Sequence, residues 1–193
     1  MEFGAATRPY PGMNLNGDAF FIKRWGCHAL VAAIDGLGHG QYAHRAARAA
    51  RDYISRHYDQ SLPEQFRGVG RACRATRGVV MAIARFTWSS NQSPSQNQNQ
   101  NQTTLTFATI GNIEARVIGS ATPVRFLIRR GIIGNNAPTA VATEHPWQSN
   151  YILVMHTDGL MTHWQWGGLP AFSWEVGDNY CSRTPAQTSK RKR

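Results

Sequence analysis

Residues 29–40, Ala-Leu-Val-Ala-Ala-Ile-Asp-Gly-Leu-Gly-His-Gly, carry the strongest structural signal in this chain of 193 residues. The six apolar residues predict a buried strand. Asp35 follows them directly, and the three glycines after it let the backbone approach other groups where side chains would block it. The alanine-rich segment that comes next predicts a helix. A strand that ends in a carboxylate and leads into a glycine loop is an arrangement that can hold a metal ion.

Two further acidic elements have a similar setting. Asp18, in Asn16-Gly17-Asp18, precedes a predicted strand over 19–23, and Asp158, in Thr157-Asp158-Gly159, follows one over 151–155. Asp-Gly is also the commonest hairpin turn pair, so each element alone is equally compatible with a simple turn. Asp35 fits a turn poorly because it leads into a helix. Three of the six Asp in the chain lie at strand ends, which indicates one hard-cation site assembled from distant segments.

The composition indicates a single domain with a basic surface. The formal net charge is +10, but four of the 21 Lys and Arg form the terminal run 190–193, and others recur along one face of a predicted helix. A basic surface favours anionic partners, including nucleic acids and phosphoproteins. No zinc finger, helix-turn-helix or aromatic–basic interleaving accompanies the charge, so nucleic acid is not expected to be the main partner.

The sequence also predicts the cellular compartment of the protein. No apolar run approaches the roughly 20 residues of a membrane span, so no membrane partner is expected. The start of the chain has no basic segment followed by an apolar core, so no secretion signal is expected. The three cysteines are odd in number and have no Cys-x-x-Cys spacing, which favours free thiols in a reducing cytoplasm.

The periodicity of apolar residues predicts an α+β fold. Helices are expected over 41–58 and from Leu62 to Gly78, and residues 89–102, nearly all Asn, Gln and Ser, are expected to be a floppy hairpin tip. A hairpin is expected at Gly111-Asn112. Many antiparallel strands and few helices favour two packed antiparallel sheets covered by helices. The expected strands are 79–88, 103–110, 113–120, 124–129 and 151–156.

Four segments together resemble the metal-dependent protein phosphatases (PPM, type 2C), and specifically their SpoIIE/RsbX-like bacterial branch. They occur in the family's order and extend over about residues 1–165. None of them is specific alone. The segments are Asn16-Gly17-Asp18-Ala19, residues 33–40 with the helix that follows, Gly111-Asn112-Ile113-Glu114-Ala115-Arg116, and residues 156–160.

The resemblance implies a four-layer αββα sandwich and a site for two Mn²⁺ or Mg²⁺ ions at one sheet edge. Asp35 would bridge both ions, and the carbonyl of Gly36 would bind one of them. Asp158 would bind the other, and Asp18 would act directly or through a water molecule. Oxygen ligands suit these hard ions. The expected reaction is hydrolysis of phosphoserine or phosphothreonine by an activated water, without a phospho-enzyme.

Four further polar residues have both a functional and a structural interpretation. His39 lies close to Asp35 in the sequence and is able to protonate a leaving oxygen, but such a histidine more often belongs to the loop. His44 is expected at the surface. Glu114 and Arg116 could mark a substrate edge, although a half-exposed strand needs polar residues in any case.

The C-terminal part departs from the family and looks atypical or truncated. The family's last metal aspartate has only one candidate here, Asp178 in Gly177-Asp178-Asn179, and a turn is an alternative interpretation of it. The phosphatase domain is therefore expected over 1–181, with a disordered basic tail over 182–193. The expected partner is a phosphorylated signalling protein of the stressosome or anti-sigma-antagonist type. The alternative is a catalytically impaired relative that binds such a partner without hydrolysing it.

Overall fold

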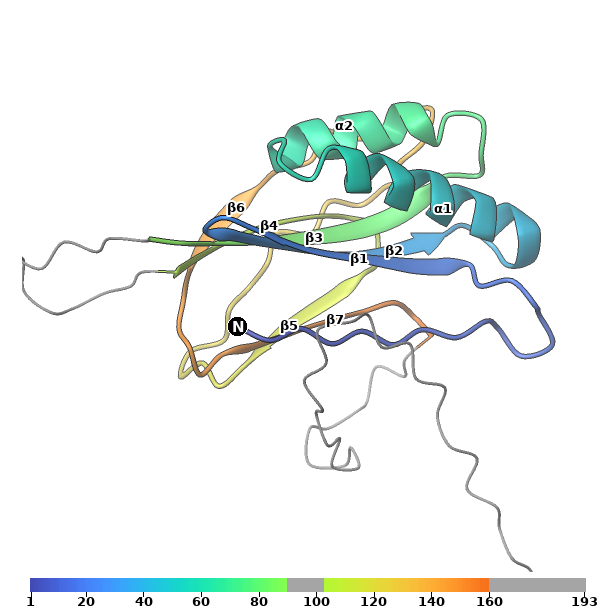
Figure 1. Ribbon diagram of the computed structural model, residues 1–193. Helices are drawn as coiled ribbons and strands as arrows, with labels where there is room; N and C mark the ends of the chain where they lie inside the picture. The colour runs from blue at the N-terminus through green and yellow to red at the C-terminus, as the bar shows by residue number, and fades with distance from the viewer. Residues whose placement is uncertain (90–102, 160–193) are drawn as a thin grey trace, which may run out of the picture.

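The computed structural model describes residues 1–89 and 103–159. Two helices cover one face of a large antiparallel sheet, and a small sheet covers the other face (Figure 1). In chain order the elements are β1 (Asp18–Trp25), β2 (His28–Gly36), α1 (Gly40–Arg56), α2 (Leu62–Ala72), β3 (Val79–Trp88), β4 (Thr103–Ile110), β5 (Glu114–Ile118), β6 (Thr143–Trp147) and β7 (Ile152–His156).

The large sheet has the strand order β1-β2-β3-β4-β6, with all neighbouring pairs antiparallel. Its middle strand, β3, is apolar on both faces over residues 79–84, because helices lie on one side and the small sheet on the other. Successive residues of β2 divide between the two sides. Leu30, Ala32 and Ile34 pack into the core under the helices, whereas Ala29 packs into the core between the sheets.

Helix α1 packs on the large sheet through a stripe of small residues. Its buried positions are Ala43, Ala46, Ala47, Ala50 and Ile54, as the helical spacing predicted. Small side chains let the helix approach closely. The approach is closest at Gly36, where an added Cβ would lie 2.1 Å from the carbonyl oxygen of Ala43.

The small sheet consists of β5 and β7, paired antiparallel. Leu153 and Met155 of β7 pack into the core between the sheets. Strands from distant parts of the sequence therefore meet here, and the end of β7 comes close to the start of β1. None of the helices in residues 1–89 and 103–159 is long and apolar enough to cross a membrane.

The α+β class with two antiparallel sheets is confirmed, but some predicted elements are wrong. No hairpin forms at Gly111-Asn112: β4 pairs with β3 and β6, while β5 pairs with β7 in the other sheet. Residues 124–129 form no strand, and β6 lies in a segment predicted as loop. Helix α2 ends at Ala72 rather than at Gly78, because Thr76 hydrogen-bonds the carbonyl of Cys73 and closes a turn.

Several other predictions concern segments outside the description. Residues 90–102 of the low-complexity tract, the basic tail 182–193 and Asp178 all lie outside the described residues. The described residues make three layers: two helices, the large sheet and the small sheet. The fourth layer of the predicted sandwich stays a prediction.

Candidate metal centre

Asp18 and Asp35 lie directly opposite each other. They are cross-strand partners in the β1–β2 ladder, at the first residue of β1 and near the end of β2. Side chains alternate along a strand, and Ile34 and Ala19 face the helices. Asp18 and Asp35 therefore both project from the opposite face of the sheet, toward the small sheet.

The glycines around these carboxylates hold the backbone together. The amide of Gly36 donates a hydrogen bond to the carbonyl of Gly17 at 3.0 Å, and the amide of Leu37 donates one to Gly78 at 3.1 Å. Gly38 has φ +90°, a conformation that residues with a side chain rarely adopt. The glycines thus position the two carboxylates and turn the chain into α1.

Thr157 connects the small sheet to this pair. Its hydroxyl donates a 2.8 Å hydrogen bond to Asp18 Oδ2 across 139 residues of sequence. Asp158 follows directly and is exposed, and its negative charge raises the pKa of both Asp18 and Asp35. Three acidic elements that are distant in sequence therefore share one electrostatic environment.

The electrostatics of the pair are unfavourable when both carboxyl groups are ionised. Burial, followed by the charges of Asp18 and Asp158, raises the pKa of Asp35 to about 7. Burial also raises the pKa of Asp18, although the hydrogen bond from Thr157 acts in the other direction. A nearby cation would relieve this repulsion.

The predicted site residues are thus partly brought together. Asp18, Asp35, Gly36 and Asp158 lie at one end of the sheets, whereas Asp178 lies outside the described residues. Within residues 1–89 and 103–159, no three His, Cys, Asp or Glu side chains are grouped closely enough to form a complete metal site. Asp18 and Asp35 form the nucleus of the arrangement, with Asp158 beside them.

The histidines near the site have structural contacts. His44, predicted as a surface residue, is half-buried, and its Nδ1 donates a 2.9 Å hydrogen bond to the carbonyl of Asn16. It therefore holds the loop before Asp18. His39 is exposed at the N-cap of α1 and stacks on Tyr10 with ring centroids 6.4 Å apart.

Glu114 is paired locally at the start of β5. It contacts Arg116 at 3.2 Å and His156, its cross-strand partner, at 3.5 Å. These contacts support the structural interpretation of Glu114 and Arg116.

Sequence reasoning gave no role to three residues around the carboxylates. Thr157 belongs to the Thr157-Asp158-Gly159 motif, but the sequence predicts no contact for its hydroxyl. Its position directly before Asp158 is the signal that it lies near the carboxylates. Arg77 lies over the ring of Tyr42 at 4.6 Å, beside the glycine loop. No local pattern in the sequence indicated this pair.

A groove of about 630 Å³ also starts at Asp18 and runs between β1 and α1 to Ser55.

The comparisons with known proteins agree with the fold described above. No family model matches the chain. It is 21% identical over 151 residues to the phosphoserine phosphatase RsbX of Bacillus subtilis (strain 168), covering 77% of this chain and 69% of that protein. A structure of RsbX in complex with magnesium has a TM-score of 0.68 at 20% identity and covers 81% of this chain and 73% of RsbX.

Two more solved structures are similar. One has a TM-score of 0.70 at 27% identity, and the match covers 84% of this chain and 77% of the other chain. It is described as "The bacterial stressosome: a modular system that has been adapted to control secondary messenger signaling". The PP2C phosphatase domain of SpoIIE from Bacillus subtilis has a TM-score of 0.60 at 14% identity, covering 75% of this chain and 42% of that one.

Proposed function

We propose that this chain, an RsbX/SpoIIE-like member of the metal-dependent protein phosphatase (PPM, type 2C) family, hydrolyses phosphoserine or phosphothreonine in a bacterial signalling protein. The observation that carries the proposal is the pairing of Asp18 with Asp35, joined to the Thr157-Asp158 element of the other sheet. A binding module gains no stability from three carboxylates that repel one another, whereas a metal-dependent hydrolase needs them.

The Asp18–Asp35 pair fits a divalent metal ion as part of its ligand set. The raised pKa values of Asp18 and Asp35 reflect an excess of negative charge that a cation would offset. The available donors are carboxylate oxygens and the backbone carbonyl of Gly36, and such hard oxygen ligands suit Mg²⁺ or Mn²⁺. In the proposed site Asp18, Asp35 and Asp158 hold the metal together with Gly36, and two ions are bound.

Each residue around the proposed site has a separate role in the reaction. When bound, the ions lower the pKa of water and offset the charge on the phosphoryl oxygens. Asp35 holds its carboxylate at the junction of the two sheets. Thr157 orients Asp18 by donating a hydrogen bond to one oxygen, which leaves the other oxygen for the metal. Gly36 has no side chain, which lets α1 approach β2 closely at Ala43 and so fixes the backbone that follows Asp35.

The proposed substrate is a phosphorylated protein of the stressosome or anti-sigma-antagonist type, and the proposed location is the cytoplasm. The similarity to RsbX and to a chain from a structural study of the bacterial stressosome supports the class of partner. The free thiols of Cys27 and Cys73 support a reducing compartment.

The test is release of inorganic phosphate from a phosphoserine peptide during titration with Mg²⁺ or Mn²⁺. We expect turnover that saturates with metal and stops with EDTA. Asp35→Asn is expected to lose at least about 100-fold in kcat/KM, because it removes the carboxylate charge at the centre of the site. Asp52→Asn is the matched control, since Asp52 lies on the outer part of α1 and is expected to keep full activity.

Two outcomes would contradict the proposal. Wild-type turnover in Asp35→Asn would show that the site assignment is wrong. Metal-dependent binding of the phosphopeptide without phosphate release would instead identify the chain as a non-catalytic relative that recognises a phosphorylated partner.

A further inference from the structure

Three exposed arginines lie at the end of the large sheet that carries Asp35. Arg77 directly precedes the loop into β3, and Arg129 and Arg130 lie on the segment that passes the ends of β3 and β4. No carboxylate among the described residues lies within ion-pair distance of these three arginines. The four ion pairs that the described residues do form lie elsewhere. We call Arg77, Arg129 and Arg130 the cationic rim.

Backbone hydrogen bonds fix the rim relative to the carboxylates. The amide of Leu37 donates to the carbonyl of Gly78, so Arg77 lies one residue from the loop that follows Asp35. Val79 exchanges two backbone hydrogen bonds with Ile133, and the amide of Gly111 donates to Arg129. With strands about 5 Å apart, the segment 129–133 lies roughly 10–15 Å from β2.

Arg77 is the rim residue nearest to Asp35, and its side chain is held by contacts within the protein. The guanidinium of Arg77 lies over Tyr42 at 4.6 Å, and its Nη1 is 2.9 Å from the position that a Cβ would take on Gly38. Tyr42 is 61% exposed and Ile132 is 45% exposed, so apolar surface flanks the charge. Stacking on an aromatic ring leaves the edge of a guanidinium available for hydrogen bonds to an anion.

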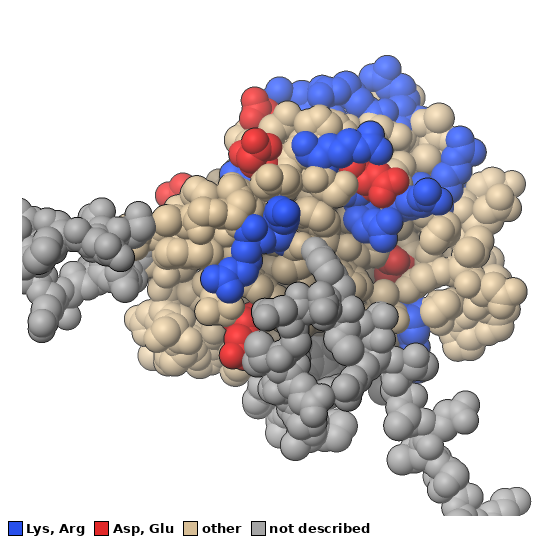
Figure 2. Space-filling model, viewed as in Figure 1, with Lys and Arg blue, Asp and Glu red and all other residues tan. Residues whose placement is uncertain are grey.

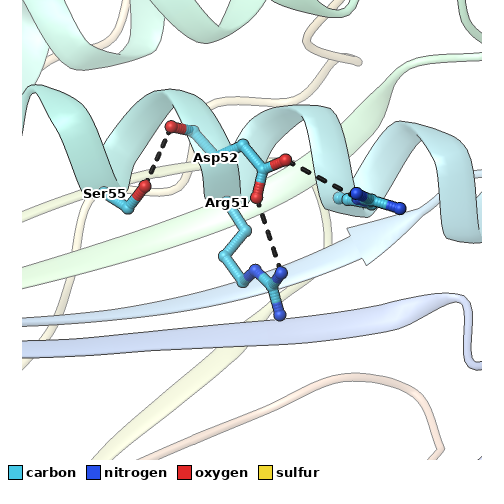
Figure 3. A network of polar contacts seen from close by, with 4 residues as sticks. Arg51, Asp52 and Ser55 are labelled. Carbon is cyan, nitrogen blue, oxygen red and sulfur yellow. Dashed lines mark hydrogen bonds and ion pairs between the residues drawn. The ribbon is translucent and has the colours of Figure 1, made fainter.

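The arginines of the helical layer have a different environment. Figure 2 shows Lys and Arg gathered over α1 and α2, with Asp and Glu among them. Asp52 contacts both Arg48, at 3.7 Å, and Arg51, at 3.5 Å (Figure 3). Hydrogen bonds from Ser61 chiefly lower the pKa of Glu64, and the charge of Arg67 contributes to the same shift, so Arg67 and Glu64 are also neighbours. Three arginines of the helical face thus have an acidic neighbour, whereas no ion pair within the described residues is found for any arginine of the rim.

We propose that the cationic rim docks an acidic segment of the phosphoprotein substrate, with the phosphorylated residue at the carboxylate pair. This inference rests on the proposed function and specifies its substrate class. An extended peptide advances about 3.3 Å per residue, so a rim that reaches about 10–15 Å from β2 meets side chains roughly three to five residues from the phosphorylated one. Acidic residues at those positions complement the rim.

The experiment measures, by anisotropy in Mg²⁺, the binding of two fluorescein-labelled peptides that carry the phosphonate analogue of phosphoserine. The C–P bond of this analogue prevents turnover, and Mg²⁺ offsets the negative charge of the carboxylate pair. One peptide carries Asp and Glu at the three positions from three to five residues away, and the other carries Asn and Gln there. At a low ionic strength of about 50 mM, we expect the acidic peptide to bind wild-type protein about tenfold more tightly. That ratio corresponds to about 1.4 kcal/mol.

Two triple variants locate the surface. The rim variant is Arg77→Ala/Arg129→Ala/Arg130→Ala, and it is expected to bind both peptides equally. The control variant, Arg48→Ala/Arg51→Ala/Arg67→Ala, loses the same charge from the helical face and is expected to keep the tenfold preference. Arg77→Lys alone is expected to keep part of it, and thermal melting checks that each variant is folded.

Each remaining outcome overturns the proposal. Equal binding of the two peptides by the wild type, or no binding of either, would show that the rim does not recognise acidic residues near the phosphorylated one. Loss of preference in the control variant would place the peptide in the groove between β1 and α1, where Arg48 and Arg51 lie. Equal competition by a single-stranded oligonucleotide of the same charge would indicate a general polyanion surface. Because no step requires turnover, a retained preference in a protein that hydrolyses nothing would contradict only the proposed function.

Discussion

Asp35 combines partial burial with two carboxylate neighbours, and this makes the metal-free fold sensitive to pH. Its pKa is about 7 in the folded protein, against an ordinary value of 3.8. Between these values the folded chain holds a proton that the unfolded chain releases. The stability of the metal-free protein should therefore fall as the pH rises from about 4 to about 7.

Replacing Asp35 by Asn should remove this dependence. Wild-type protein in EDTA is expected to lose roughly 1–2 kcal/mol between pH 5 and pH 8 from this group, after allowance for solvent screening of a partly exposed carboxyl. Asp35→Asn should show a correspondingly flatter profile and a higher stability at pH 8. Urea unfolding at both pH values measures the difference, and an unchanged pH slope in the variant would show that Asp35 is not the titrating group.

In the proposed metal site, Thr157 would act through Asp18. Burial raises the pKa of Asp18, and Thr157→Val removes the 2.8 Å hydrogen bond that opposes this rise. We expect Mg²⁺ to bind about tenfold more weakly, because outer hydrogen bonds orient the ligands of a metal. Calorimetry measures the affinity. Thr157→Ser keeps the hydroxyl and should bind within about threefold of wild type; equal loss in both variants would indicate a packing effect instead.

The separate elements were predicted well wherever a local pattern determines them. The alanine spacing identified the buried face of α1, and the β-branched and aromatic run 79–88 gave β3 with the observed bounds. β6 was missed because it is short and contains Pro146, which a strand tolerates only at an edge or a terminus. It does lie at the edge of the large sheet.

The contact between α1 and β2 depends on the missing side chain of Gly36. A Cβ on this residue would lie 2.1 Å from the carbonyl oxygen of Ala43, and backbone atoms cannot move aside cheaply. Gly36→Ala is therefore expected to destabilise the fold by about 3 kcal/mol or more in urea unfolding. Gly134→Ala is the control, because its nearest contact would be an ordinary 3.5 Å. Similar losses in the two variants would mean that the close approach is not responsible.

The way in which strands are combined into sheets was less predictable than the strands themselves. Gly111-Asn112 looked like a hairpin turn, and Gly111 does have φ +105°. The chain nevertheless leaves the large sheet there, since the amide of Gly111 bonds to Arg129 and β5 joins β7. A local turn signal gives no information about which sheet receives the next strand. The three acidic elements could be predicted to meet because each lies at the end of a strand, whereas the rim depends on a loop with no local pattern.

The metal site should join the two sheets of the whole molecule. Asp18 and Asp35 belong to the large sheet, whereas Thr157 and Asp158 follow β7 of the small one, and their carboxylates repel one another without a cation. Bound Mg²⁺ would replace that repulsion with shared ligation and stabilise the state in which the two sheets are joined against local opening of the small sheet. In hydrogen exchange, Mg²⁺ is therefore expected to slow the amides of β5 and β7 by about tenfold or more, with a much smaller effect on the central strand β3. Asp35→Asn should abolish the difference. Equal slowing across both sheets would contradict the prediction, because it would mean that the ion stabilises the fold as a whole rather than the junction between the sheets.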